Sequence, residues 1–136
     1  MKESRLQNYV KKFYKRLGFL VYKTMGGFVK GASYAVSPGW PDLIILGDDK
    51  GVFFIECKNE TGKLRDTQIV KIYELQERGH QIFIARPDDK NQEHFILSDV
   101  TITPSQYIRA LERIEAHKEM KKLKRSEAKL NNEKNT

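Results

Sequence analysis

The sequence contains a single cysteine, Cys57, which excludes an internal disulfide and a cysteine-rich zinc site. Its three histidines, His80, His94 and His117, show no metal-ligand spacing. No apolar run approaches the ~20 residues that span a bilayer. Residues 1–6 also lack the apolar region of a secretory signal. We therefore expect a cytoplasmic protein without a membrane span.

Charge is unevenly distributed along the 136 residues, whose formal net charge is +7. Residues 1–30 contain eight Lys and Arg and one acid, and residues 111–136 contain eight bases and five acids. The middle, residues 31–110, contains nine bases and twelve acids. Basic flanks favour a polyanionic partner, with nucleic acid first and an anionic membrane surface second. Lysine-rich helices that are simply well solvated would give the same pattern.

Hydrophobic periodicity predicts an α/β domain in which a mixed sheet is flanked by helices, in the order α-β-β-β-α-β with a C-terminal helix. Residues 94–97 fit either a short edge strand or a helical turn, and residues 25–41 form a glycine-rich loop. We expect residues 1–115 to form the domain and residues 116–136 a basic helical tail that frays. The expected helices are 3–17, 65–78 and one from 103, and the expected strands are 19–22, 42–46, 52–58 and 80–85.

Charged residues lie at the end of an apolar strand. Because strand side chains alternate between faces, Glu56 and Lys58 share one face of strand 52–58. Asp42 begins the preceding strand, so a hairpin would bring two carboxylates and one ammonium together. Two acids can hold a hard cation such as Mg²⁺, and the lysine can position an attacking water. A solvated strand end with Asp42 as a cap is the alternative.

The spacing of these residues resembles the PD-(D/E)XK nuclease signature, and three further elements resemble its VRR-NUC branch. The resemblance covers about residues 3–90 and implies a restriction-endonuclease-like fold with divalent-metal-dependent endonuclease activity. The matching elements are Gly-Trp-Pro-Asp-Leu-Ile at residues 39–44, Ile-Glu-Cys-Lys at 55–58, and a G-x-L…Q run formed by Gly62, Leu64 and Gln68.

Roles for individual residues follow from this resemblance alone. It implies that Mg²⁺, with Mn²⁺ as an alternative, is bound by Asp42, Glu56 and the backbone carbonyl of Cys57. It also implies three catalytic positions, Lys58, Gln68 and Glu3. Glu3 would contact a metal-bound water, although an acid at that position is also typical of a helix N-terminus.

The resemblance further implies a homodimer that cuts branched DNA such as a Holliday junction, since two symmetric cuts need two active sites. A flap or end-processing nuclease and a catalytically idle DNA-binding module are the alternatives. The dimer contact would come from the last helix or from residues 94–97. Lysines and arginine at residues 118–125 form either a second DNA contact or a solvated helix end. Predicted phosphate contacts are Lys11, Lys12, Lys15, Arg16 and Lys30.

Overall fold

The computed structural model describes residues 1–24, 38–49, 51–91 and 93–134 of the chain. Most of the glycine-rich loop and the predicted DNA contact Lys30 therefore lie outside the described residues. The elements are α1 (Glu3–Arg16), β1 (Leu20–Lys23), β2 (Leu43–Gly47), β3 (Gly51–Cys57), α2 (Asp66–Glu77), β4 (Gln81–Pro87), β5 (Phe95–Asp99) and α3 (Pro104–Lys134).

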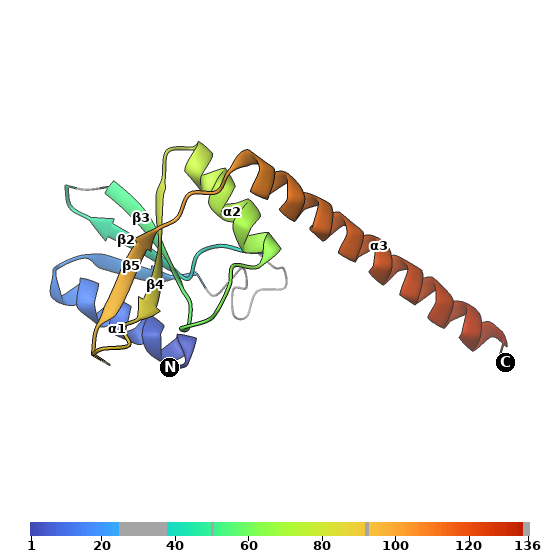
Figure 1. Cartoon of the computed structure of the whole chain (residues 1–136), viewed down its shortest axis with the longest axis horizontal. Coiled ribbons are helices and arrows are strands. Elements are labelled where there is room, and N and C mark those ends of the chain that lie inside the picture. The colour runs from blue at the N-terminus through green and yellow to red at the C-terminus, as the bar shows by residue number, and fades with distance from the viewer. Residues whose placement is uncertain (25–37, 50, 92, 135–136) are drawn as a thin grey trace.

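The five strands form one mixed sheet in the spatial order β1-β2-β3-β4-β5 (Figure 1). β3 and β4 are parallel and α2 connects them, whereas the other three pairs are antiparallel. The predicted α/β architecture, with its α-β-β-β-α-β core and C-terminal helix, is confirmed. Within the segment 94–97, residues 95–97 belong to a strand rather than a helical turn, because β5 pairs with β4 over its whole length.

Helices pack on both faces of the sheet, and each face has its own core. α1 packs on the face that includes Ile45, Ile55 and Cys57. α2 packs on the other face, against Phe54 and Ile82. Because side chains alternate along β3, the face that carries Phe54 also carries Glu56. This alternation places the acid of the predicted site under α2.

The last helix, α3, packs antiparallel to α2 and then extends beyond the body of the protein (Figure 1). At its start, the ring of Tyr107 stacks on Tyr73 with the centroids 4.3 Å apart. Further along, Arg113 forms an ion pair with Asp66, the first residue of α2. The predicted tail is helical to Lys134, and the helix is continuous across residues 115 and 116. Among the described residues, no helix has the length and apolar character needed to cross a bilayer.

Candidate active site

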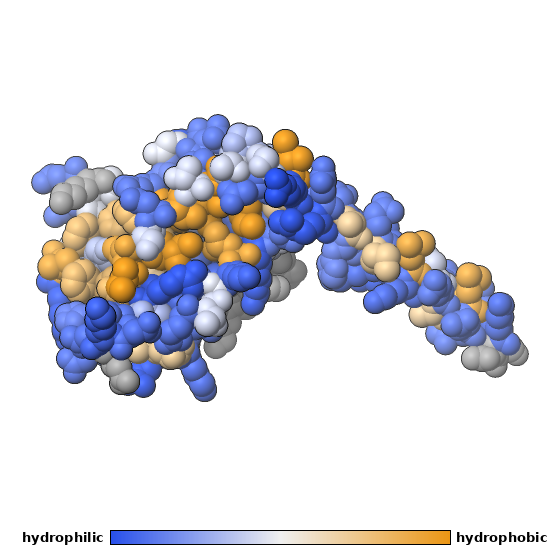
Figure 2. Space-filling view, in the orientation of Figure 1, coloured by the Kyte–Doolittle hydropathy of each residue, from blue (hydrophilic) through white to orange (hydrophobic). Residues whose placement is uncertain are grey.

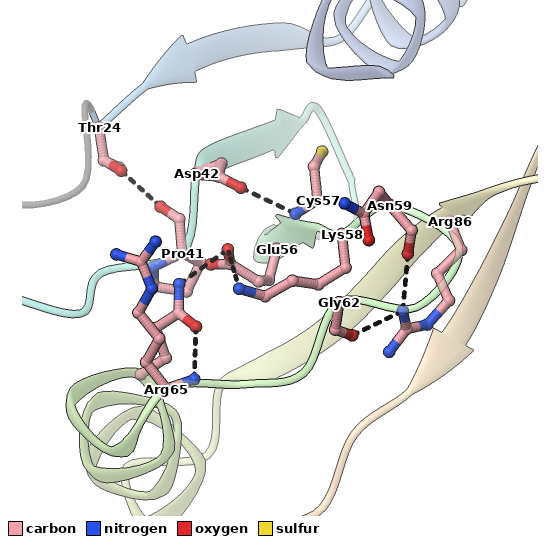
Figure 3. Close-up of polar contacts among 11 residues, drawn as sticks. Thr24, Pro41, Asp42, Glu56, Cys57, Lys58, Asn59, Gly62, Arg65 and Arg86 are labelled. Atoms are coloured by element: carbon pink, nitrogen blue, oxygen red, sulfur yellow. Dashed lines mark hydrogen bonds and ion pairs between the residues drawn. The ribbon is translucent and has the colours of Figure 1, made fainter. Parts of the chain in front are cut away.

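Asp42 lies at the start of β2 and is fixed by the backbone of the neighbouring strand. Its Oδ2 accepts a hydrogen bond of 2.8 Å from the amide N–H of Cys57 (Figure 3). The preceding residue, Pro41, is held in turn, because its carbonyl accepts a hydrogen bond from the hydroxyl of Thr24. The carboxylate of Asp42 is therefore positioned by the β2–β3 pairing that the hairpin reading predicted.

Glu56 is almost completely buried, with 1% of its surface exposed. Its Oε1 accepts a hydrogen bond of 3.1 Å from the side-chain amide of Gln68 and lies 3.9 Å from the Nζ of Lys58. Its other oxygen, Oε2, is buried and has no hydrogen-bond partner among the described residues. A buried carboxylate oxygen without a partner is unfavourable, so this position favours a proton or a cation.

The protonation of Glu56 reflects this environment. Burial, followed by the negative charge of Asp42, raises the pKa of Glu56 from its ordinary value to about 9, and the nearby Lys58 opposes the rise. Two carboxylates in one low-dielectric site resist ionising together. Glu56 is therefore protonated at neutral pH unless a cation balances the charge of the pair.

Lys58 follows β3 and is buried, with 4% of its surface exposed. Gly62 lies beside it: a Cβ at Gly62 would lie 3.4 Å from the Cδ of Lys58 and 3.5 Å from a carboxylate oxygen of Glu3. Arg86 holds the intervening loop, since its guanidinium donates hydrogen bonds of 2.8 Å to the carbonyls of Asn59 and Gly62 (Figure 3). The loop thus lies against both the stem of Lys58 and the carboxylate of Glu3.

Gln68 has two contacts that fix its side chain. It is the third residue of α2, and its Oε1 accepts a hydrogen bond of 2.9 Å from the backbone N–H of Arg65. Its Nε2 donates to Glu56, as described above. The same amide therefore caps the helix and contacts the buried acid, which sets the orientation of both.

These side chains surround a cavity of about 300 Å³. Five of the predicted site residues line it, namely Glu3, Asp42, Glu56, Lys58 and Gln68. Cys57 is not among the lining residues; its thiol lies in the α1-side core, where burial raises its pKa and keeps it neutral. The role predicted for its backbone carbonyl stays a prediction.

The sequence model of the VRR-NUC domain family matches residues 32–89 of the chain, which include Asp42, Glu56, Lys58 and Gln68 of this cavity but not Glu3. The chain contains a VRR-NUC domain. The nuclease type of domain predicted from the sequence is thereby confirmed.

Two solved structures match part of the chain. One is described as a VRR-NUC domain; it is 29% identical, has a TM-score of 0.49, and the match covers 60% of this chain and 81% of that chain. The other is Hjc from Archaeoglobus fulgidus, described as a Holliday junction resolvase from an archaeal hyperthermophile. It is 14% identical, with a TM-score of 0.48 over 76% of this chain and 90% of that chain. None of the curated proteins compared with the chain matches it.

The cavity that Asp42 and Glu56 line also includes residues that the sequence analysis did not single out. Arg65 and Thr67, at the N-terminal end of α2, line it beside Trp40 and Gly39. Arg65 is exposed, so its guanidinium can meet an anion that enters the cavity. An arginine at the first residue of the predicted helix 65–78, between Leu64 and Gln68 of the G-x-L…Q run, was the available signal.

The basic residues predicted on the first helix do not form one stripe. Lys12 and Arg16 border a hollow between α1 and β5. Helical periodicity places Lys11 and Lys15 about 100° around α1 from Lys12 and Arg16, respectively. All four lie at least two turns along the helix from Glu3, the α1 residue that reaches the cavity. Their role in DNA binding stays a prediction.

The donor set of the VRR-NUC cavity fits a hard divalent cation. Asp42 and Glu56 offer carboxylate oxygens, and the unpartnered Oε2 of Glu56 is the atom that a cation would satisfy. Among the described residues, no three His, Cys, Asp or Glu side chains gather into a ready-made metal cage. Mg²⁺ is commonly held by one or two carboxylates with several waters, so a site of two acids suits it better than Zn²⁺.

Proposed function

We propose that the protein is a divalent-metal-dependent DNA endonuclease that hydrolyses phosphodiester bonds. One observation carries this proposal: the buried acid Glu56 contacts both Lys58 and Gln68 and shares its cavity with a second carboxylate, Asp42. A carboxylate pair beside a buried ammonium suits the binding of a cation and the stabilisation of charge on a phosphoryl group.

In this proposal, Asp42 and Glu56 would hold Mg²⁺, with Mn²⁺ as an alternative, and the backbone carbonyl of Cys57 would supply a third oxygen. The bound metal lowers the pKa of its water and neutralises charge on the phosphate. Lys58 positions the attacking water and stabilises the negative charge that develops during attack.

In this proposal, the other polar residues of the cavity orient the acid Glu56, a water molecule and the substrate phosphate. Gln68 holds Glu56 through its 3.1 Å hydrogen bond, so that one oxygen stays directed to the cation. Glu3, which also lines the cavity, would hold and orient a water molecule there. Arg65 binds a neighbouring phosphate, which places the scissile bond at the carboxylates.

We further propose that the enzyme acts on branched DNA as a homodimer. Among the described residues, α1 is the only helix on its face of the sheet, and it leaves two adjoining hollows of about 760 and 430 Å³ beside it. Tyr14 and Leu97 line both hollows, and Phe13, beside them, is 46% exposed. Apolar side chains also gather on the body in Figure 2. A second copy would cover this aromatic face and supply the second active site.

Cleavage of defined substrates tests the proposal. A four-way junction, a flap and a plain duplex are each incubated with the protein, with and without Mg²⁺. Paired symmetric nicks in the junction that require the metal are the expected result. Cutting of flaps or free ends alone would identify the end-processing alternative. Binding without cleavage under any of these conditions would identify the idle DNA-binding module.

Variants separate this activity from a contaminating nuclease. Asp42→Ala and Lys58→Ala remove one carboxylate and the ammonium from the cavity, so each is expected to abolish cleavage. Full activity in either variant would overturn the proposed mechanism. Glu127→Ala, on the exposed part of α3, serves as the control and is expected to cleave normally.

A further inference from the structure

The distal part of α3 separates its charges by face. With 3.6 residues per turn, positions i, i+3, i+4, i+7 and i+11 fall on one side of a helix. Lys and Arg occupy all five of these positions, and no Asp or Glu of the helix falls inside the arc that they span. All five side chains are exposed. We call this side the basic face of α3; it consists of Lys118, Lys121, Lys122, Arg125 and Lys129.

The basic face continues the side of α3 that packs on α2. Tyr107, Ala110 and Ile114 are the half-buried or buried residues of that packed side. Lys118 lies four residues after Ile114, and Lys121 lies eleven residues after Ala110, so both project in the same direction. Beyond the N-terminus of α2, therefore, the same side of α3 carries basic side chains in place of apolar contacts.

The exposed part of α3 leaves the body at the end where the active site lies. Arg113 pairs with Asp66 at a distance of 2.9 Å, and Asp66 directly follows Arg65, which lines the cavity. Because α3 packs antiparallel to α2, everything beyond Arg113 extends past the N-terminus of α2 (Figure 1). The basic face thus begins beyond the N-terminal end of α2, the end whose Arg65 and Thr67 line the cavity.

We propose that the basic face of α3 binds the phosphates of a DNA duplex arm outside the cleavage site. This inference rests on the proposed function, since it concerns how the same substrate is held. At 1.5 Å per residue, Lys129 lies ~24 Å along the axis from Arg113. That length corresponds to roughly seven base pairs at about 3.4 Å each. The contact is independent of base sequence and applies to arms long enough to reach it.

The opposite side of α3 offers a charge-matched control. Lys124 and Lys134 fall outside the basic face by the same helical arithmetic. The double variant Lys122→Gln/Lys129→Gln removes two charges from the face, and Lys124→Gln/Lys134→Gln removes two charges from elsewhere on the same helix. Circular dichroism of both full-length variants checks that their helix content is equal.

Binding to four-way junctions is measured in EDTA, where no cleavage occurs, with arms of about 15 or about 4 base pairs, above and below the reach of α3. We expect Lys122→Gln/Lys129→Gln to weaken long-arm binding roughly fivefold at 0.15 M salt, and to reduce the slope of log affinity against log salt by about 1.8. The control pair should change both quantities less, and the two pairs should bind short arms equally.

Equal loss of long-arm affinity in both pairs would overturn the proposal, because it would show that net charge alone acts. Unchanged binding in both pairs would also overturn it. The proposed function is tested separately, by cleavage in Mg²⁺. If the wild-type protein does not cleave but the basic-face pair still loses long-arm affinity, the phosphate contact stands without the nuclease activity. If the wild type cleaves and the pairs bind alike, the contact alone fails.

Discussion

Asp42 and Cys57 are joined by a hydrogen bond from the Cys57 amide to Asp42 Oδ2, 2.8 Å long, which links the start of β2 to the end of β3. The contact leaves the other carboxylate oxygen of Asp42 available to the cavity that it lines. The main chain of the sheet therefore sets the position of Asp42 relative to Glu56, which directly precedes Cys57 in β3. A catalytic group held in this way needs little reorganisation when substrate arrives.

Asp42→Asn separates charge from position. The amide oxygen of asparagine can still accept the Cys57 N–H, so the melting temperature should stay close to that of the wild type. Loss of the charge should lower the cleavage rate at least about a hundredfold, more than loss of a group that only supports a metal ligand. The two measurements are thermal unfolding without metal and the cleavage rate in Mg²⁺. A fall in both would instead indicate that the hydrogen bond had broken.

Glu56→Gln should stabilise the metal-free protein. In the unfolded chain Glu56 ionises near its ordinary value of 4.5, whereas in the folded protein its pKa is about 9. Between these values the unfolded chain binds fewer protons, so wild-type stability falls as pH rises. Glutamine removes this dependence and keeps the acceptor for Gln68.

The gain in melting temperature should therefore be small at pH 5 and larger at pH 8, where the stabilisation exceeds about 1 kcal/mol, since one pKa unit corresponds to about 1.4 kcal/mol. Unfolding without metal is followed at both pH values. Glu127→Gln, an exposed acid of α3, serves as the control and should change the melting temperature little at either pH. A gain for Glu56→Gln that does not grow with pH would contradict the argument.

Gln68→Ala should lower both stability and activity, because it removes a helix cap and the donor to Glu56. Gln106 caps α3 in the same way, since its side chain accepts a 2.8 Å hydrogen bond from the backbone N–H of Thr103. Gln106→Ala is therefore a matched control that loses only the cap. Gln106→Ala should cost about 1 kcal/mol of folding free energy, and Gln68→Ala should cost more, because it also leaves buried Glu56 without this donor. Only Gln68→Ala should slow cleavage; equal slowing in both would assign the effect to stability.

The sequence predicted the carboxylates, the lysine and the strands that hold them, because each follows from local periodicity. Strand alternation placed Glu56 and Lys58 on one face, and the hairpin brought Asp42 to them. This reasoning could not place Arg65 at the cavity, since the position of Arg65 depends on how the loop before α2 returns to the sheet. The burial of Glu56 was likewise invisible, because it depends on Gln68 and on the packing of α2.

The end of α3 was harder to predict for another reason. Apolar periodicity fades beyond residue 120, which favoured a frayed tail. Residues 105–134 nevertheless contain no Gly or Pro and are rich in Lys, Glu, Ala and Leu, which have high helix propensity. The pattern of packing stops near Ile114 while the preference for helix continues to Lys134. Apolar periodicity therefore indicates which part of a helix packs against the rest of the protein, whereas helix propensity indicates how far the helix extends.

Gly39→Ala should be strongly destabilising. Gly39 has a positive φ of 90°, and a Cβ there would lie 2.1 Å from the carbonyl oxygen of Thr67. Gly18 has the same φ, but a Cβ there would meet nothing within 4 Å. Gly18→Ala should therefore show only the backbone strain of about 1–2 kcal/mol, and Gly39→Ala a larger loss. Chemical denaturation measures both, and similar losses would show that the loop before Asp42 moves away from α2 freely.

Phe13→Glu should convert the proposed homodimer to a monomer. Phe13 is 46% exposed and lines the hollow between α1 and β5. Its ring packs edge-on against Phe95, with the ring centroids 5.3 Å apart. Leu123 on α3 is 57% exposed and represents the other surface considered for the dimer. A carboxylate within a covered apolar interface is costly, whereas on an open surface it has little effect.

Light scattering after size exclusion gives the mass of the wild type, Phe13→Glu and Leu123→Glu at equal concentration. We expect a dimer for the wild type and Leu123→Glu, and a monomer for Phe13→Glu. A monomer only for Leu123→Glu would place the interface on α3, and a monomeric wild type would contradict the dimer. Because two symmetric cuts need two sites, Phe13→Glu should also lose paired nicking of a four-way junction while its carboxylates stay intact.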